Sequence, residues 1–193
     1  MKNLALFASG NGTNVQRIAQ YFSDRQDIRI KLIVCNNPQA FVLERAKKLE
    51  IETLLLTDKE TFYQSNEVVR ILQQNYIDFI VLAGFLWLIP SHLIEAYPNK
   101  IINIHPALLP KYGGKGMYGM RVHEAVVANG ETESGITIHY VNQHYDEGKI
   151  IFQTKCAIAS GDTAENVAQK IHALEYEYFP KIIENEIKRV THC

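Results

Sequence analysis

Residues 100–116 read KIINIHPALLPKYGGKG, an apolar strand that carries two polar side chains and then stops. Asn103 and His105 stand two positions apart, so on an extended strand they point to the same side. Pro106 and Pro110 cannot continue a ladder of backbone hydrogen bonds, so the strand opens into a shaped loop. Open α/β sheets bind ligands at the carboxyl ends of their strands. The stretch therefore predicts a site built on an amide and an imidazole, unless the two are simply a turn asparagine and a surface histidine.

Short apolar runs alternate with helical patterns before this stretch. Strands buried on both faces are expected at residues 4–8, 30–34, 53–56 and 79–83. Helices are expected between them at residues 14–22, 40–49 and 60–74. This alternation predicts a parallel, doubly wound α/β sheet.

The pattern changes in the last third of the chain. Residues 135–141 and 150–156 predict an antiparallel pair of strands appended to the mostly parallel sheet. A long helix is expected to follow, with Asp162 or Thr163 as its N-cap. We expect it to continue to about residue 187, with an interruption at Pro180.

The composition points to small-molecule ligands. The 193 residues carry 20 Lys and Arg against 21 Asp and Glu, a net charge of -1, which gives no electrostatic case for nucleic acid or an anionic membrane. No apolar run approaches the roughly 18 residues that span a bilayer, and no signal peptide is recognisable. Three scattered cysteines suggest neither disulfides nor a zinc site. We expect one domain, residues 1–193, that acts in the cytoplasm as a monomer or homodimer.

A glycine-containing turn follows the first expected strand. Residues 9–14 read SGNGTN, and the glycines allow backbone N–H groups to turn toward an anion at the start of the next helix. The turn lacks the third glycine of a dinucleotide-binding turn and the lysine of a nucleoside triphosphate loop. By pattern alone it is either a tight connection or a binding site.

Three motifs, in this order along the chain, resemble the folate-dependent formyltransferases. They are SGNGTN at residues 9–14, VLAGF at 81–85 and NIHPALLP at 103–110. The resemblance is to the small, single-domain members, with a Rossmann-like variant fold, and covers most of the chain. It implies transfer of the formyl group of 10-formyltetrahydrofolate, a co-substrate, to the amine of glycinamide ribonucleotide in purine biosynthesis.

The resemblance also implies the catalytic residues. Asn103 and a protonated His105 would donate hydrogen bonds to the oxyanion that develops during formyl transfer. Asp146 would raise the pKa of His105 and help to move a proton. The chemistry requires no metal. His139, His144 and Asp146 have a spacing that could suggest a metal cluster, but His139 is better interpreted as a supporting or core histidine.

The resemblance places the two substrates at opposite ends of the site. Gly12, Thr13 and Asn14 would cradle the ribose 5-phosphate. His172 and Glu175, three apart on one helical face, would contact the rest of the ribonucleotide, although Glu175 could instead be a solvated carboxylate.

The folate would lie against the loop after the fourth strand. The implied contacts are Leu86, Trp87, Leu88, Ile89, Asn103 and Val141, with Lys59 as a weak candidate for the glutamate carboxylate. By pattern alone, residues 81–90 are simply core. Trp87 stands where some relatives carry a basic residue. The loop at residues 113–121 is longer and richer in glycine than usual, and we expect it to be a mobile lid. His92, His123 and His192 receive no role.

Three other functions compete with this interpretation. Methionyl-tRNA formyltransferases have a second, basic domain for which the chain is too short, and formyltetrahydrofolate hydrolases have an additional N-terminal regulatory domain. A nucleotide-binding module without catalysis could use the same sheet. The presence of Asn103, His105 and Asp146 together argues against that module.

Overall fold

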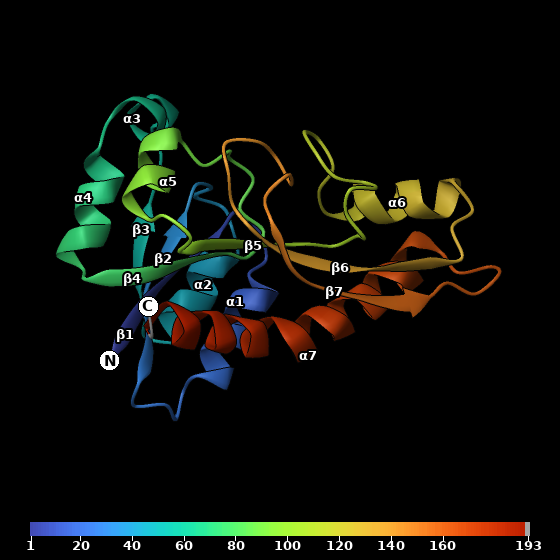
Figure 1. The fold of residues 1–193 in the computed structure, drawn as a ribbon, viewed down its shortest axis with the longest axis horizontal. Coiled ribbons are helices and arrows are strands. Elements are labelled where there is room, and N and C mark those ends of the chain that lie inside the picture. The colour runs from blue at the N-terminus through green and yellow to red at the C-terminus, as the bar shows by residue number, and fades with distance from the viewer. Residues whose placement is uncertain (192–193) are drawn as a thin grey trace.

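Seven strands form one mixed sheet in the computed structural model, which describes residues 1–191 (Figure 1). The strands are β1 (Lys2–Ala8), β2 (Ile28–Cys35), β3 (Glu52–Leu55), β4 (Ile77–Leu82), β5 (Ile101–His105), β6 (Glu133–Tyr140) and β7 (Ile150–Ala157). The helices are α1 (Thr13–Tyr21), α2 (Val42–Lys48), α3 (Lys59–Gln64), α4 (Glu67–Gln74), α5 (Ser91–Ala96), α6 (Met120–Ala128) and α7 (Ala164–Thr191). His192, to which the sequence assigns no role, and Cys193 lie outside the described residues.

The strand order is β3-β2-β1-β4-β5-β6-β7. Strands β1 to β5 run parallel, whereas β6 is antiparallel to β5 and β7 to β6. This confirms the predicted doubly wound sheet with an appended antiparallel pair. The chain winds outward from β1 to β3 on one side and from β4 to β7 on the other, so the loops after β1 and β4 separate in the middle of the sheet. Ligands bind at such a switch point.

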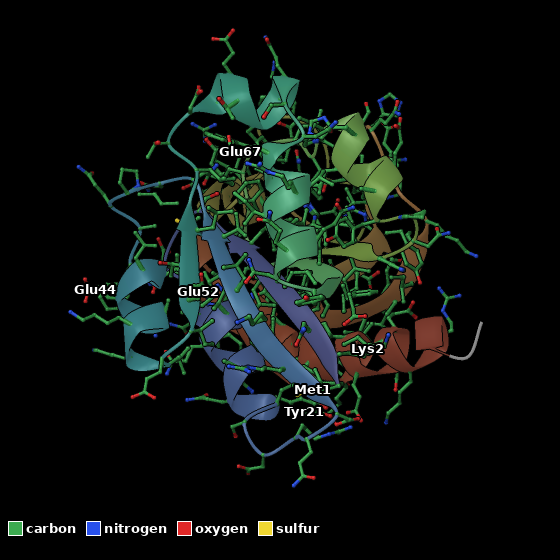
Figure 2. The ribbon with its side chains drawn as sticks, turned by 90° about the vertical axis from the view of Figure 1, so that its left-hand side faces the viewer. Met1, Lys2, Tyr21, Glu44, Glu52 and Glu67 are labelled. Carbon is green, nitrogen blue, oxygen red and sulfur yellow. The ribbon has the colours of Figure 1, made fainter. Side chains whose placement is uncertain are left out.

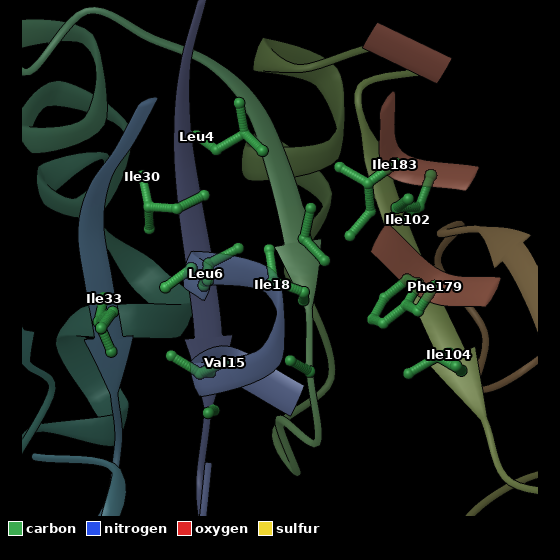
Figure 3. Packing of buried hydrophobic residues seen from close by; sticks show 14 of the residues in the cluster. Leu4, Leu6, Val15, Ile18, Ile30, Ile33, Ile102, Ile104, Phe179 and Ile183 are labelled. Atoms are coloured by element: carbon green, nitrogen blue, oxygen red, sulfur yellow. The ribbon is translucent and has the colours of Figure 1, made fainter. Parts of the chain in front are cut away.

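The central strands are buried on both faces, which explains why they are almost entirely apolar. On β1, Leu4 and Leu6 belong to the cluster that packs under α1, α2 and α7 (Figure 3), whereas Ala5 and Phe7 face α3, α4 and α5. Figure 2 looks onto the β3 edge, where Glu52 is labelled, with α2 on one side of the sheet and α4 on the other.

The single helix expected at residues 60–74 is instead two helices, α3 and α4, and that expectation is wrong. Ser65 has an extended backbone and ends α3. Its Oγ donates to the carbonyl of Thr61 at 2.9 Å and accepts from the N–H of Glu67 at 3.3 Å. A serine that bonds the local backbone in this way competes with helix continuation.

Helix α7 runs without a break through Pro180, so the expected interruption is also wrong. Proline has no N–H and leaves free the carbonyl four residues earlier, here that of Tyr176. Arg17 on α1 donates from Nε to this carbonyl at 3.2 Å, which satisfies it. At the helix start, Thr163 caps the N–H of Asn166 at 3.3 Å, as one of the two expected alternatives.

The sequence patterns do not predict α5 or α6. Helix α6 begins at Met120, so the last two residues of the loop expected at 113–121 belong to its first turn. Its buried face carries Val122, His123 and Val126 and packs against α7. The glycines immediately before Met120 hide this short pattern, because glycine disfavours a helix.

Candidate active site

A cavity of about 610 Å³ opens at the carboxyl ends of β1, β4 and β5. The sequence-predicted site residues that line it are Gly12, Thr13, Asn14, Leu86, Trp87, Leu88, Ile89, Asn103, His105, Val141, Asp146, His172 and Glu175. Lys59 is not part of the wall. A volume of this size is typical of small-molecule sites.

Asn103 and His105 reach the cavity because β5 ends there. The loop that follows is held by Thr137 of β6, which is fully buried. Its Oγ1 accepts from the N–H of Leu109 at 3.0 Å and donates to the carbonyl of Ala107 at 2.7 Å. Satisfying these buried backbone groups fixes the exit of β5, and with it the position of His105.

His105 is 3% exposed, and each of its ring nitrogens faces an oxygen atom. Nε2 lies 2.7 Å from the carbonyl oxygen of Tyr112, and therefore carries a proton that it donates. Nδ1 lies 3.4 Å from Oδ2 of Asp146. Tyr112 has a left-handed backbone, φ 58°, and its hydroxyl donates to Glu131 at 2.8 Å, which anchors the residue whose carbonyl meets His105.

The expectation of a raised His105 pKa is wrong for this arrangement of side chains. Burial disfavours the imidazolium and lowers the pKa of His105 below its ordinary value. The Asp146 carboxylate and the Tyr112 carbonyl favour the charged form but do not outweigh burial. At neutral pH the imidazole is therefore neutral, with its proton on Nε2 and a lone pair on Nδ1.

Asp146 contacts both the end of β5 and the glycine-rich loop that follows it. Its Oδ2 accepts from the N–H of Gly114 at 2.9 Å, and its Oδ1 lies 3.4 Å from Nδ2 of Asn103. Burial would raise the pKa of Asp146, but its contacts with His139 and His105 and the Gly114 N–H hold the pKa below its ordinary value. The carboxylate is therefore ionised at neutral pH.

His139 supports this group from β6, as predicted. Its Nδ1 lies 2.8 Å from the carbonyl oxygen of Tyr140 and donates to it, so its Nε2 accepts from Nδ2 of Asn103 at 3.1 Å. One of the two Asn103 amide hydrogens is thus fixed. The other points only loosely at Asp146 and can be redirected to a ligand oxygen.

The first turn of α1 forms the opposite end of the cavity. Gly12 precedes it with a left-handed backbone, φ 76°, and no described side chain caps the helix. The N–H groups of Thr13 and Asn14 are therefore left uncapped at the helix N-terminus, a position that favours an anion. Arg45 on α2 holds the turn from outside, donating to Asn11 at 2.8 and 2.7 Å.

Glu175 is buried beside this helix start, so the alternative of a solvated carboxylate is wrong. It is 6% exposed, and its Oε2 accepts from Nδ2 of Asn14 at 3.0 Å. Burial raises the pKa of Glu175 to about 7, against the effect of that hydrogen bond. His172, one turn earlier, is exposed and stacks on Tyr176.

The apolar wall lies in the loop after β4. Ser9 ties this loop to the turn after β1, because its Oγ accepts from the N–H of Leu86 at 2.9 Å. Trp87 is half-buried: its ring lines the cavity and also lies 5.4 Å, between centroids, from Phe62 of α3. Lys59 is exposed, with Nζ 5.8 Å from the centroid of the Trp87 ring.

Sequence reasoning missed several groups that the fold brings to the site. They are the carbonyl of Tyr112, the N–H of Gly114 and the side chain of His123, which lines the cavity from α6. Backbone groups leave no signal in a sequence. His123 would have been found only with α6 assigned, since it then falls on the buried face between Val122 and Val126.

Among residues 1–191, none of the helices combines the length and the apolar character that a membrane-spanning helix needs. Within the same residues, no group of three or more His, Cys, Asp or Glu side chains is placed to hold a metal ion, and His144 is exposed.

Comparison with known proteins decides the family. The family model described as formyl transferase matches residues 2–183. The chain belongs to the formyl transferase family. It is 39% identical to the chloroplastic phosphoribosylglycinamide formyltransferase of Arabidopsis thaliana, with 97% of this chain and 67% of that protein covered. It is 38% identical to phosphoribosylglycinamide formyltransferase of Bacillus subtilis, with 95% and 93% covered.

Solved structures of this family have the same fold. Phosphoribosylglycinamide formyltransferase from Bacillus halodurans matches with a TM-score of 0.84 at 36% identity, over 95% of this chain and 94% of that one. Glycinamide ribonucleotide transformylase 1 from Geobacillus kaustophilus matches with a TM-score of 0.83 at 37% identity, over 95% and 97%. These formyltransferase structures therefore share the architecture of nearly the whole described chain.

Proposed function

We propose that this formyltransferase transfers the formyl group of 10-formyltetrahydrofolate to the amine of glycinamide ribonucleotide, giving formylglycinamide ribonucleotide and tetrahydrofolate. One observation carries the proposal. The amide of Asn103, the imidazole of His105 and the carboxylate of Asp146 converge in a cavity whose two ends suit different ligands. Relatives covered over more than nine tenths of their length are named phosphoribosylglycinamide formyltransferase.

The ribonucleotide fits the end at α1. The uncapped N-terminus at Thr13 and Asn14 offers N–H donors to the phosphate. Glu175 has Asn14 as a hydrogen-bond donor and sits where ribose hydroxyls can supply further donors. A buried carboxylate with so little hydrogen bonding is stabilised by such a ligand.

The folate fits the apolar end. Leu86, Trp87 and Ile89 offer an aliphatic and aromatic wall to the flat pterin ring. We propose that Lys59, which lies outside the wall, reaches only a part of the folate that projects from the cavity. Asn103 and Val141 then face the formyl end.

His105 moves the proton in this mechanism. The neutral amine attacks the formyl carbon, and a C–N bond forms as the carbonyl electron pair moves onto oxygen. The lone pair on Nδ1 accepts a proton from the attacking nitrogen, and the Asp146 carboxylate stabilises the resulting imidazolium. Asn103 donates its loosely held amide hydrogen to the oxyanion.

In the second half of the reaction the oxyanion and the imidazolium both lose their charge. The oxyanion electron pair re-forms the carbonyl as the bond to N10 breaks, and His105 returns its proton to N10. The enzyme ends in its starting state, with Nε2 still held by the carbonyl of Tyr112. The mechanism asks for no nucleophilic side chain and no metal.

An assay with both substrates tests this function. We expect purified protein to release tetrahydrofolate from 10-formyltetrahydrofolate only when glycinamide ribonucleotide is present. Release at the same rate without the ribonucleotide would indicate a hydrolase instead. Transfer only to methionyl-tRNA would indicate the other competing activity.

The phosphate turn gives a paired prediction. At Gly12 a Cβ would lie 2.5 Å from Cγ2 of Val42, on a positive φ, whereas at Gly10 it would meet nothing within 4 Å. We expect Gly12→Ala to weaken ribonucleotide binding and to lower the free energy of unfolding by about 1–3 kcal/mol, because the turn must move. Gly10→Ala should leave stability unchanged. Calorimetric titration with each ligand checks this, and equal losses of ribonucleotide and folate affinity in Gly12→Ala would contradict it.

Trp87, the only tryptophan, reports on the folate end. We expect a folate analogue to change its emission saturably and the ribonucleotide alone to change it little, because the indole lines the apolar wall. Trp87→Ala should weaken folate binding by about 1–3 kcal/mol, and Trp87→Phe, which keeps an aromatic ring against Phe62, by less. Emission that stays constant after correction for light absorbed by the folate would place Trp87 in the core instead.

We also propose a reducing compartment, such as the cytoplasm, as the place of action, with residues 1–193 as one domain and a monomer or homodimer as the working unit. Cys35 and Cys156 support the compartment, because both are free thiols.

A further inference from the structure

His123 is a buried histidine that makes no hydrogen bond to the described residues. His105 bonds through Nε2 to the carbonyl of Tyr112, and His139 has partners at both ring nitrogens. His123 is only 3% exposed, lines the cavity from α6, and its Nδ1 is enclosed without a partner among the described residues. No hydrogen bond joins either nitrogen of the ring to a described residue, and a buried imidazole in a cavity wall with no such bond points to a ligand that binds the ring.

His123 lines the same cavity as His105, at the transfer end, and His172, at the ribonucleotide end. In glycinamide ribonucleotide the group between the ribose and the attacking amine is an amide. A side chain that shares the cavity wall with both ends can therefore meet that amide.

The protonation state of His123 defines what it can offer. Burial, with the two neighbouring histidines, lowers its pKa to about 4, so the ring is neutral at pH 7. A neutral imidazole has one N–H and one lone pair. Enclosed N–H groups without acceptors are rarer than under-satisfied acceptors, so the lone pair belongs on enclosed Nδ1 and the proton on Nε2.

We propose that His123 is a further substrate-binding residue, whose Nε2–H donates a hydrogen bond to the amide carbonyl of glycinamide ribonucleotide. The proposal rests on the formyl-transfer function above and adds a source of specificity. Acceptors that carry the amine but lack the neighbouring carbonyl leave His123 unpaired, and should therefore bind weakly.

Three variants test the residue. We expect His123→Leu to raise the KM for the ribonucleotide on the order of ten-fold and to leave the folate Kd unchanged. Its thermal stability should not fall, because an unpaired polar group is removed. His123→Gln, which keeps a donor, should recover part of the loss. His92→Leu on α5 is the matched control: Nε2 of His92 is also buried without a partner, but His92 is outside the cavity wall and its replacement should not change KM.

A substrate analogue tests the same contact without any variant. We compare a carbocyclic glycinamide ribonucleotide with its counterpart in which the amide carbonyl is a methylene group. Wild-type protein should bind the methylene compound about ten-fold more weakly, and His123→Leu should bind both about equally. Equal binding by active wild-type protein would overturn the role of His123, whereas wild-type protein that transfers no formyl group would overturn the proposed function itself.

Discussion

Replacing His105 or Asp146 by asparagine is expected to lower kcat by roughly 10²–10⁴-fold, the range for a lost acid–base group. His105→Asn removes the lone pair that accepts the proton. Asp146→Asn removes the charge that stabilises the imidazolium, while an amide oxygen remains to accept from the N–H of Gly114. Kd values for both substrates should change little, because neither residue is proposed to bind a substrate in its ground state.

Two controls distinguish this unit from general damage. The double variant should lose much less than the product of the single losses, because Asp146 acts through His105. Asp146→Asn should also lower the pKa of His105 further, since the carboxylate is the main influence that raises it, and an NMR titration of the ring measures this. Near-normal kcat in either folded single variant would remove the residue from the mechanism.

Glu175→Gln is expected to stabilise the fold at alkaline pH while weakening ribonucleotide binding. The pKa of Glu175 is raised from 4.5 to about 7 by burial. Below pH 4.5 the carboxyl is protonated in both the native and the unfolded chain and adds no pH dependence. Between pH 4.5 and 7 the native state keeps a proton that the unfolded chain releases, so stability falls as the pH rises.

Above pH 7 the full unfavourable contribution, about 3 kcal/mol from the size of the shift, is present. Glutamine removes it, so the variant should gain stability of that order at pH 8 and almost none at pH 4. Glu177→Gln is the matched control on the same helix, because Glu177 is exposed and paired with Lys181 at 3.6 Å. Denaturant unfolding at the two pH values measures both variants, and an unchanged difference across this range would contradict the buried charge.

The ribonucleotide affinity of Glu175→Gln gives the functional half of this prediction. We expect a loss of affinity for the ribonucleotide but not for a folate analogue, since Glu175 accepts from Asn14 at the α1 end of the cavity. Wild-type affinity in the folded variant would leave Glu175 with only a structural role.

The sheet could be predicted from the sequence because strands that are buried on both faces appear as continuous apolar runs. Runs such as residues 4–8 are apolar on both faces, and the order of strands and helices then leaves few topologies. The two wrong expectations about the fold concern where helices are interrupted, which depends on local contacts. Ser65 ends a helix through its hydroxyl, and Pro180 is accommodated because Arg17 arrives from a distant segment.

Most of the residues expected at the candidate site could be brought together from the sequence, but the electrostatics of the site could not be predicted. The structure brings Asn103, His105 and Asp146 together in one cavity, because the end of β5 and the loop between β6 and β7 meet there. The pKa of His105 depends on burial and on the Tyr112 carbonyl, neither of which is visible in the sequence. The role proposed for His123 depends likewise on α6, whose pattern is too short to be recognised.

The fate of the formyl carbon tests the central claim most directly. Protein is mixed with 10-formyltetrahydrofolate labelled with ¹³C in the formyl group and with glycinamide ribonucleotide labelled with ¹⁵N in the amine. We predict a product whose ¹³C signal is split by a one-bond coupling to ¹⁵N, formed in equal amount with tetrahydrofolate. The protein with both His105→Asn and Asp146→Asn should form it at least about 10²-fold more slowly. Label recovered as free formate, or a product without the coupling, would contradict transfer to the amine.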